Sequence, residues 1–105
     1  MFGMGNRTPN VSIMEIDSLL GKINLIDVRE PYECAMGILD TAKNIPVNVL
    51  LMAPENFLKK SETYHIVCHS GSRSGQACAI LAGAGYDVVN VVGGMGRYGG
   101  NRIKR

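Results

Sequence analysis

Eight consecutive residues, Cys68 to Gly75, combine one thiol, one arginine and a run of small residues. The apolar segment Tyr64 to Val67 before them predicts a buried strand, and a helix is expected to open at Ser72 or Arg73. In parallel α/β sheets, ligands bind beyond the carboxyl ends of strands, where loops meet helix N-termini. The pattern therefore places a candidate nucleophile where ligands of such sheets are bound.

The surroundings expected for Cys68 favour its thiolate form. A helix N-terminus carries about half a positive charge and unpaired N–H groups, and a curled Gly/Ser loop turns further N–H groups inward. Arg73 adds a full positive charge and a planar fork that suits an oxyanion. Because each of these lowers a thiol pKa, we predict that Cys68 is largely ionised at neutral pH. The alternative is that Cys68 is a small buried hydrophobic residue.

Strands alternate with helices along the rest of the chain. Ile23 to Val28 and Val88 to Val92 are apolar runs typical of buried strands. Between the strand before Cys68 and Val88, apolar residues recur at helical spacing, which predicts an amphipathic helix over 72–84. Strand, helix and strand in this order form a parallel crossover, so we predict an α/β domain with a mostly parallel sheet. Shorter expected elements are a helix after Ser12 with Glu15 completing a capping box, a helix over Pro31–Met36, a strand at Asn44–Pro46 and a helical stretch over Val47–Lys60.

Composition excludes several classes of protein. The chain has 105 residues, enough for one domain, and 46% are hydrophobic, which excludes intrinsic disorder. A net charge of +2 gives no argument for nucleic-acid binding, and no run of 18 apolar residues is present to span a membrane. Cys34, Cys68 and Cys78 are odd in number and lack C-x-x-C spacing, which argues against a disulfide framework or a zinc knuckle. We predict a cytoplasmic protein without a signal peptide, metal or cofactor.

The chain is expected to divide into three parts. Residues 1–10 are rich in Gly, Asn and Pro and read as a flexible leader, and residues 11–100 form the domain. Residues 101–105 are a basic tail that either steers anions or is simply solvated.

Five motifs follow one another along the chain: Leu25–Glu30, Gly37–Pro46, the C-x-x-G-x-R loop Cys68–Arg73, the helix residues Arg73 to Tyr86, and Val92-Gly93-Gly94. Together and in this order they resemble the rhodanese-like domain family, whose members are sulfurtransferases that carry sulfur as a cysteine persulfide. Three positions differ from the usual family residue: Ile38 replaces histidine, Thr41 replaces glycine and Tyr98 replaces tryptophan.

The resemblance implies a single rhodanese-like domain, with a five-stranded sheet covered by helices on both faces. It makes Cys68 the nucleophile that takes sulfur from an anionic donor such as thiosulfate and passes it to cyanide, a thiol or a protein cysteine. Four residues separate Cys68 from Arg73, which fits a sulfur atom, whereas related phosphatases and arsenate reductases hold a larger oxyanion. The residues expected to bind substrate are His69, Ser70, Gly71, Ser72 and Arg73.

Several residues and one functional alternative stay open. Asp27 and Arg29 either brace the active loop or stabilise the fold away from it. Arg97 is a candidate for attracting an anionic donor, and Cys78 either packs in the core or carries a second sulfur. The competing function is a persulfide carrier or interaction module that works only with a partner protein.

Overall fold

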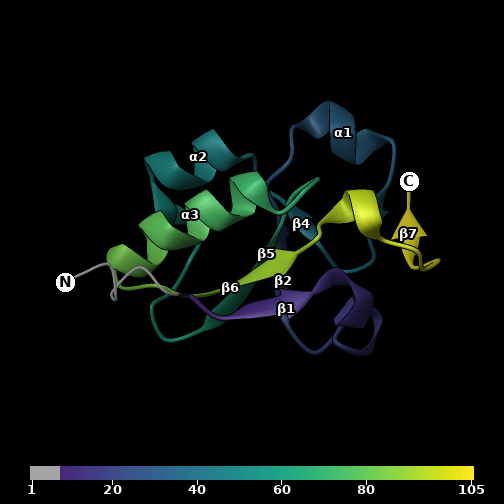
Figure 1. Ribbon diagram of the computed structural model, residues 1–105. Coiled ribbons are helices and arrows are strands. Elements are labelled where there is room, and N and C mark those ends of the chain that lie inside the picture. Colours follow the sequence, from purple (N-terminus) through teal and green to yellow (C-terminus); the bar gives the residue numbers. More distant parts are fainter. Residues whose placement is uncertain (1–7) are drawn as a thin grey trace.

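The computed structural model describes residues 8–105, and its main element is a five-stranded sheet (Figure 1). Every neighbouring pair of strands runs parallel, which confirms the predicted α/β class. In spatial order the strands are β1 (Asn10–Ser12), β6 (Asp87–Val92), β5 (Thr63–Val67), β2 (Asn24–Asp27) and β4 (Lys43–Asn44).

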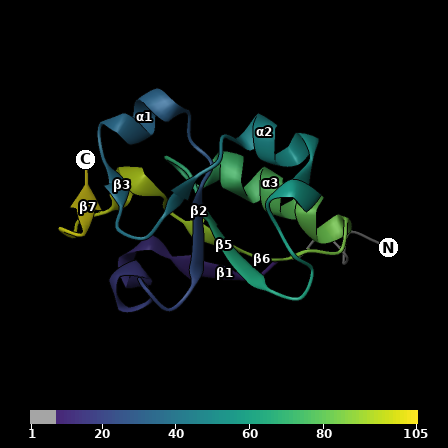
Figure 2. The same cartoon turned by 180° about the vertical axis from the view of Figure 1, so that it is seen from behind.

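Helices cover both faces of this sheet, as Figure 2 shows from behind. The α-helices α2 (Val47–Met52) and α3 (Ser72–Gly83) pack together on one face, and the 3₁₀ helix η2 (Ile13–Ser18) covers the other. Within residues 8–105, no helix combines the length and the apolar character needed to cross a bilayer. The remaining helices are α1 (Pro31–Ala35), η3 (Pro54–Asn56) and η4 (Met95–Arg97).

Strand periodicity divides the core into two clusters. Along β5, Tyr64 and Ile66 point to the α2/α3 face, whereas Val67 points to the η2 face. Cys68 follows the same alternation and faces α3, so the strand itself aims the sulfur at the N-terminus of that helix.

Two predicted helices differ from the structure. The segment after Ser12 is a 3₁₀ helix, and the Ser12 hydroxyl accepts from the Met14 N–H at 3.1 Å instead of joining a capping box with Glu15. The predicted box is therefore wrong, because the tighter 3₁₀ turn brings a nearer donor to the cap. The helical stretch over 47–60 splits at Pro54 into α2 and η3, since proline lacks the N–H that a continuous helix needs.

Both ends of the described chain join strands. Residues 1–7 of the expected leader lie outside the described residues, but Asn10 begins β1 and pairs with Asn90. Inside the expected tail, β7 (Ile103–Lys104) pairs antiparallel with β3 (Ile38–Leu39), so these two residues of the tail form a strand. The pairing follows from packing, because Ile103 joins the apolar cluster under η2.

A buried ion pair fixes the turn after β2. The Arg29 side chain donates to both Asp27 carboxylate oxygens at 2.8–3.0 Å and to the Gly37 carbonyl at 2.8 Å. The side chains of Asp27 and Arg29 are 0% and 8% exposed. Neither side chain hydrogen-bonds to the loop that follows Cys68, so the contacts match the fold-stabilising alternative for this pair.

Replacing Arg29 with alanine leaves the Asp27 carboxylate buried without a counter-charge. We expect Arg29→Ala to lower the free energy of unfolding by about 3 kcal/mol, measured by urea denaturation. Arg102→Ala is the matched control, because the Arg102–Asp40 pair is 43% and 46% exposed and its loss should cost less than about 1 kcal/mol. Equal losses for the two variants would contradict this role of Arg29.

Candidate functional site

The sulfur of Cys68 lies in a cradle formed by the loop before α3. It accepts from the N–H of Gly71 at 3.0 Å and from the N–H of Ser74 at 3.4 Å. The Ser74 hydroxyl oxygen lies 3.3 Å from the same sulfur. Cys68 is 0% exposed, so a reacting molecule must reach the sulfur through the mouth of this loop.

Two opposing influences set the pKa of the Cys68 thiol. Burial is the largest single influence and raises the pKa, because it penalises the thiolate charge. The hydrogen bonds of the Ser74 hydroxyl and of the N–H groups of Ser74, Gly71 and Ser70 lower it. Together these hydrogen bonds prevail, and the pKa of Cys68 lies below the ordinary thiol value. The sulfur is therefore hidden from water, while its lowered pKa favours the thiolate form.

The η4 helix binds two carbonyls of the same loop and so sets the direction of the N–H groups that share their peptide units. The Met95 N–H donates to the Cys68 carbonyl at 2.8 Å, and the Gly96 N–H donates to the His69 carbonyl at 2.7 Å. In a trans peptide unit the N–H lies opposite the carbonyl, so an outward His69 carbonyl turns the Ser70 N–H inward. Gly94 makes this approach possible, because a Cβ there would lie within 2.6 Å of backbone atoms of Cys68 and His69.

Gly71 closes the cradle in a conformation that suits glycine. Its φ of 97° is left-handed, and a Cβ at this position would lie 3.3 Å from the Gly93 nitrogen. The Asn90 side chain, 9% exposed on β6, donates to the Gly71 carbonyl at 3.5 Å from beneath. The α3 helix opens at Ser72, as predicted, directly after this residue.

The structure places the Arg73 guanidinium on Glu33 of α1 rather than on the sulfur. The two nitrogens Nη1 and Nη2 donate to the two carboxylate oxygens of Glu33, each at 3.0 Å. The Arg73 hydrogen bonds are the main cause that lowers the pKa of Glu33 to about 2. Glu33 also accepts from the Glu30 N–H at 2.8 Å, which fixes the start of α1. Arg73 thus joins α1 to the N-terminus of α3, and the oxyanion-binding fork expected from the sequence is occupied by this carboxylate.

The remaining predicted residues line the mouth or lie in the core. The side chains of His69, Ser70 and Ser72 are exposed, and the Ser70 hydroxyl accepts from the Ser72 N–H at 3.3 Å. Burial raises the pKa of Cys34 to about 11 and that of Cys78 to about 12. Among the three cysteines, only Cys68 therefore has a lowered pKa.

Sequence reasoning missed the roles of Glu33, Ser74, Asn90 and Gly94. Ser74 carries a usable signal, because it lies in the first turn of the helix whose N-terminus faces the thiol. Glu33 follows Glu30 at capping-box spacing, which signals a helix start but says nothing of Arg73, 40 positions away. Asn90 and Gly94 act through tertiary contacts that the local sequence does not reveal.

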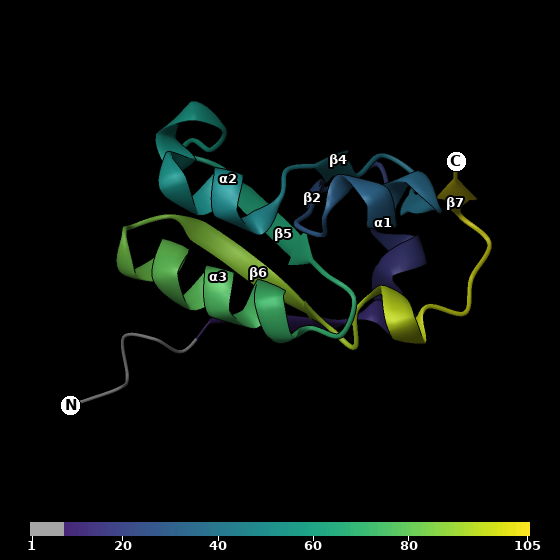
Figure 3. The ribbon, with the colours of Figure 1, turned by 90° about the horizontal axis from the view of Figure 1, so that it is seen from above.

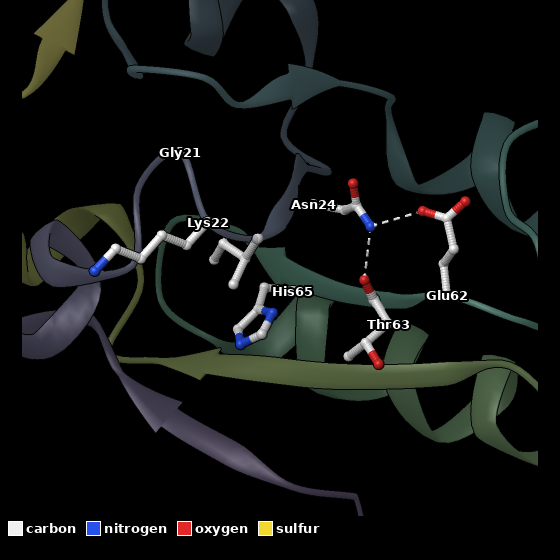
Figure 4. A pocket seen from close by; sticks show the side chains of 7 residues that line it. Gly21, Lys22, Asn24, Glu62, Thr63 and His65 are labelled. Atoms are coloured by element: carbon white, nitrogen blue, oxygen red, sulfur yellow. Dashed lines mark hydrogen bonds between the residues drawn. The ribbon is translucent and has the colours of Figure 1, made fainter.

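A cavity of about 430 Å³ lies at the end of the sheet opposite to Cys68 (Figure 4). It surrounds the amino ends of β2 and β5, where the Asn24 amide donates to Glu62 at 3.1 Å and to the Thr63 carbonyl at 3.0 Å. No cysteine lines it. Within residues 8–105, the structure groups no three His, Cys, Asp or Glu side chains that could hold a metal ion.

Removing the Ser74 hydroxyl should raise the thiol pKa. In Ser74→Ala the sulfur loses a hydrogen bond that stabilises its thiolate, while its burial persists. The pKa of Cys68 should therefore rise. The pH profile of iodoacetamide alkylation measures it. Ser72→Ala is the matched control, because that exposed hydroxyl does not contact the sulfur. Coinciding profiles for the two variants would show that the Ser74 hydroxyl does not stabilise the thiolate.

The Glu33–Arg73 pair should make the free energy of unfolding fall as the pH is lowered. The folded pKa of Glu33, about 2, is below its ordinary value of 4.5, so the pair stabilises the fold fully above pH 4.5 and loses this effect as pH falls toward 2. Glu33→Gln should lower the free energy of unfolding by about 1 kcal/mol at neutral pH and by less at about pH 3, measured by urea denaturation. A loss that is the same at both pH values would refute the ionic origin of this stabilisation.

Comparison with known proteins agrees with this geometry. Residues 12–100 match the rhodanese-like domain family. A protein named sulfurtransferase from Allochromatium vinosum is 38% identical over 72 residues, and the match covers 68% of this chain and 66% of that protein. The human protein named thiosulfate:glutathione sulfurtransferase is 38% identical over 93 residues, with 74% and 81% covered.

The fold of a solved structure, SSP1007 from Staphylococcus saprophyticus, is also similar. It superposes with a TM-score of 0.85 at 33% identity, over 93% of this chain and 100% of that chain. The names of the two sulfurtransferase relatives support a role in sulfur transfer. With the matched residues and the shared fold, the chain belongs to the rhodanese-like domain family.

Proposed function

We propose that this protein is a sulfurtransferase that moves sulfane sulfur from thiosulfate to a thiol or to cyanide through a persulfide on Cys68. The observation that carries the proposal is the lowered pKa of a buried cysteine whose sulfur faces the N–H groups of Gly71 and Ser74. A nucleophile in such a cradle can hold a second sulfur atom, because the same N–H groups stabilise the anionic persulfide.

In the first half-reaction the Cys68 thiolate attacks the outer sulfur of thiosulfate. A bond forms between the two sulfur atoms, and the bond between the outer sulfur and the sulfonyl group breaks. The electron pair of the broken bond leaves with sulfite, so no external oxidant or reductant is needed. The inward N–H groups of the loop bind the negative charge that passes onto the outer sulfur.

In the second half-reaction an acceptor thiolate or cyanide attacks the outer sulfur of the persulfide. The new bond joins this sulfur to the acceptor, and the bond to Cys68 breaks with its electron pair on the Cys68 sulfur. The products are a persulfide or thiocyanate and the original thiolate. Two separate half-reactions predict ping-pong kinetics.

The compact cradle favours sulfur over phosphate chemistry. Four residues separate Cys68 from Arg73, and the Gly71 N–H already lies 3.0 Å from the sulfur. The Arg73 fork, which would bind phosphoryl oxygens, is bound to Glu33 instead. Phosphatase and arsenate reductase activities therefore fit this site less well than sulfur transfer.

A partner-dependent persulfide carrier is the second candidate. Complete burial of Cys68 favours it, because an acceptor has to be positioned at the loop mouth before the sulfur is reached. Met14 on η2 and Val92 at the end of β6 are 78% and 44% exposed and offer apolar contact surface.

The mass of the protein after incubation with thiosulfate tests the assignment of Cys68. We expect a reducible gain of one sulfur atom at residue 68 in the wild type, in Cys34→Ala and in Cys78→Ala, because both other thiols have raised pKa values. Cys68→Ser should gain nothing. A gain in Cys68→Ser would disprove the assignment.

Thiocyanate formation separates the enzyme from the carrier. Turnover with thiosulfate and cyanide alone supports the enzyme. Sulfur transfer that occurs only with a protein donor or acceptor supports the carrier and rules out the small-molecule reaction.

A further inference from the structure

A groove leads away from the mouth of the thiol loop between η4 and η2. In Figure 3 the yellow η4 lies beside the purple η2 and the green loop that precedes α3. Two adjoining cavities of about 340 and 680 Å³ form this η4 groove, and they share Gly93 and Arg97. The first is also lined by His69, Ser70 and Gly96, and the second by Ser12, Ile13, Met14 and Val92.

Arg97 is the charged residue common to both cavities. Its side chain is exposed and makes no ion pair or side-chain hydrogen bond with another of residues 8–105. The three arginines outside the groove that do pair, at positions 29, 73 and 102, each bind a carboxylate. The Arg97 side chain lies over Gly93, where a Cβ would be 3.5 Å from its Cδ. The guanidinium is therefore available to an anion that enters the groove.

The groove has a polar end and an apolar end. Ser70 belongs to the thiol loop and also lines the first cavity, so a ligand bound there lies at the mouth through which Cys68 is reached. The second cavity is bordered by Ile13 and by the exposed side chains of Met14 and Val92. A matching ligand has a reactive sulfur at one end, an anionic group near Arg97 and aliphatic atoms beyond it. Thiosulfate has no aliphatic atoms and fills only a small part of this space.

We propose that the η4 groove binds the acceptor, a low-molecular-weight thiol that carries a carboxylate, and that Arg97 pairs with this carboxylate. The inference rests on the proposed sulfur transfer and adds the residue that positions its thiol acceptor. The acceptor thiolate attacks the outer sulfur of the Cys68 persulfide, and the sulfur–sulfur bond to Cys68 breaks with its electron pair on Cys68. Arg97 touches no reacting atom in this step. It is a positioning residue that selects acceptors by their charge.

Single-turnover discharge of the loaded protein tests the proposal. The Cys68 persulfide is formed with excess thiosulfate, freed of donor, and mixed with glutathione or with glutathione diethyl ester, which lacks the carboxylates. We expect Arg97→Gln to slow discharge by glutathione about tenfold, because one charge-assisted contact is lost. Discharge by the ester should slow much less. Lys22→Gln, at the opposite end of the sheet, is the matched control and should leave both rates unchanged.

Two results would overturn the proposal. One is an equal loss with glutathione and with its ester. The other is a loss confined to loading by thiosulfate, which would assign Arg97 to the donor.

Binding of S-methylglutathione to the unloaded protein gives a readout that needs no persulfide. We expect its NMR titration to shift residues of the η4 groove and its affinity to fall about tenfold in Arg97→Gln. If Cys68 forms no persulfide while this binding persists, the proposed function fails and the groove stands. If the persulfide forms but S-methylglutathione shows no Arg97-dependent binding, the groove serves another occupant, such as a protein segment, and the inference fails.

Discussion

The chemistry of this protein depends on the direction of the peptide units that follow Cys68. Burial alone would raise the pKa of the thiol, and the Ser74 hydroxyl together with N–H groups that point at the sulfur reverses this effect. The direction of the Ser70 N–H is set from outside the loop, because the Gly96 N–H binds the His69 carbonyl of the same peptide unit. Part of the cradle around Cys68 is therefore oriented by η4, which makes no hydrogen bond to the sulfur itself.

The sheet topology supplies this contact. The β5 and β6 strands are parallel neighbours, so their carboxyl ends lie at the same edge, and the turn after β6 meets the loop after β5. The α3 helix returns the chain between them and brings the Ser74 hydroxyl to the sulfur. The Gly93-Gly94 turn allows backbone to approach backbone here, since a side chain at position 94 would collide with the His69 carbonyl. The same crossover unit thus builds both the nucleophile and the group that orients its loop.

The sequence predicted the parts of the site that depend on local signals. The strand, the thiol at its carboxyl end and the helix start at Ser72 follow from neighbouring residues and agree with the structure. The partner of Arg73 could not be predicted, because Glu33 is 40 positions away and meets it only in the tertiary structure. The pairing of β7 with β3 also joins segments that are far apart in the sequence. In addition, strands of two residues are too short to show a periodic pattern.

In the proposed reaction, the cradle and the η4 groove divide recognition between them. Backbone N–H groups bind a sulfur anion whatever molecule delivered it, so the cradle distinguishes sulfur from larger oxyanions but does not distinguish one acceptor from another. Selection among acceptors has to come from side chains outside the loop. Arg73 is already bound to Glu33, and Arg29 is bound to Asp27, which removes both guanidiniums from this task. Arg97 remains at the mouth with its charge unpaired among residues 8–105, and its place beside an apolar cavity joins charge selection to shape selection.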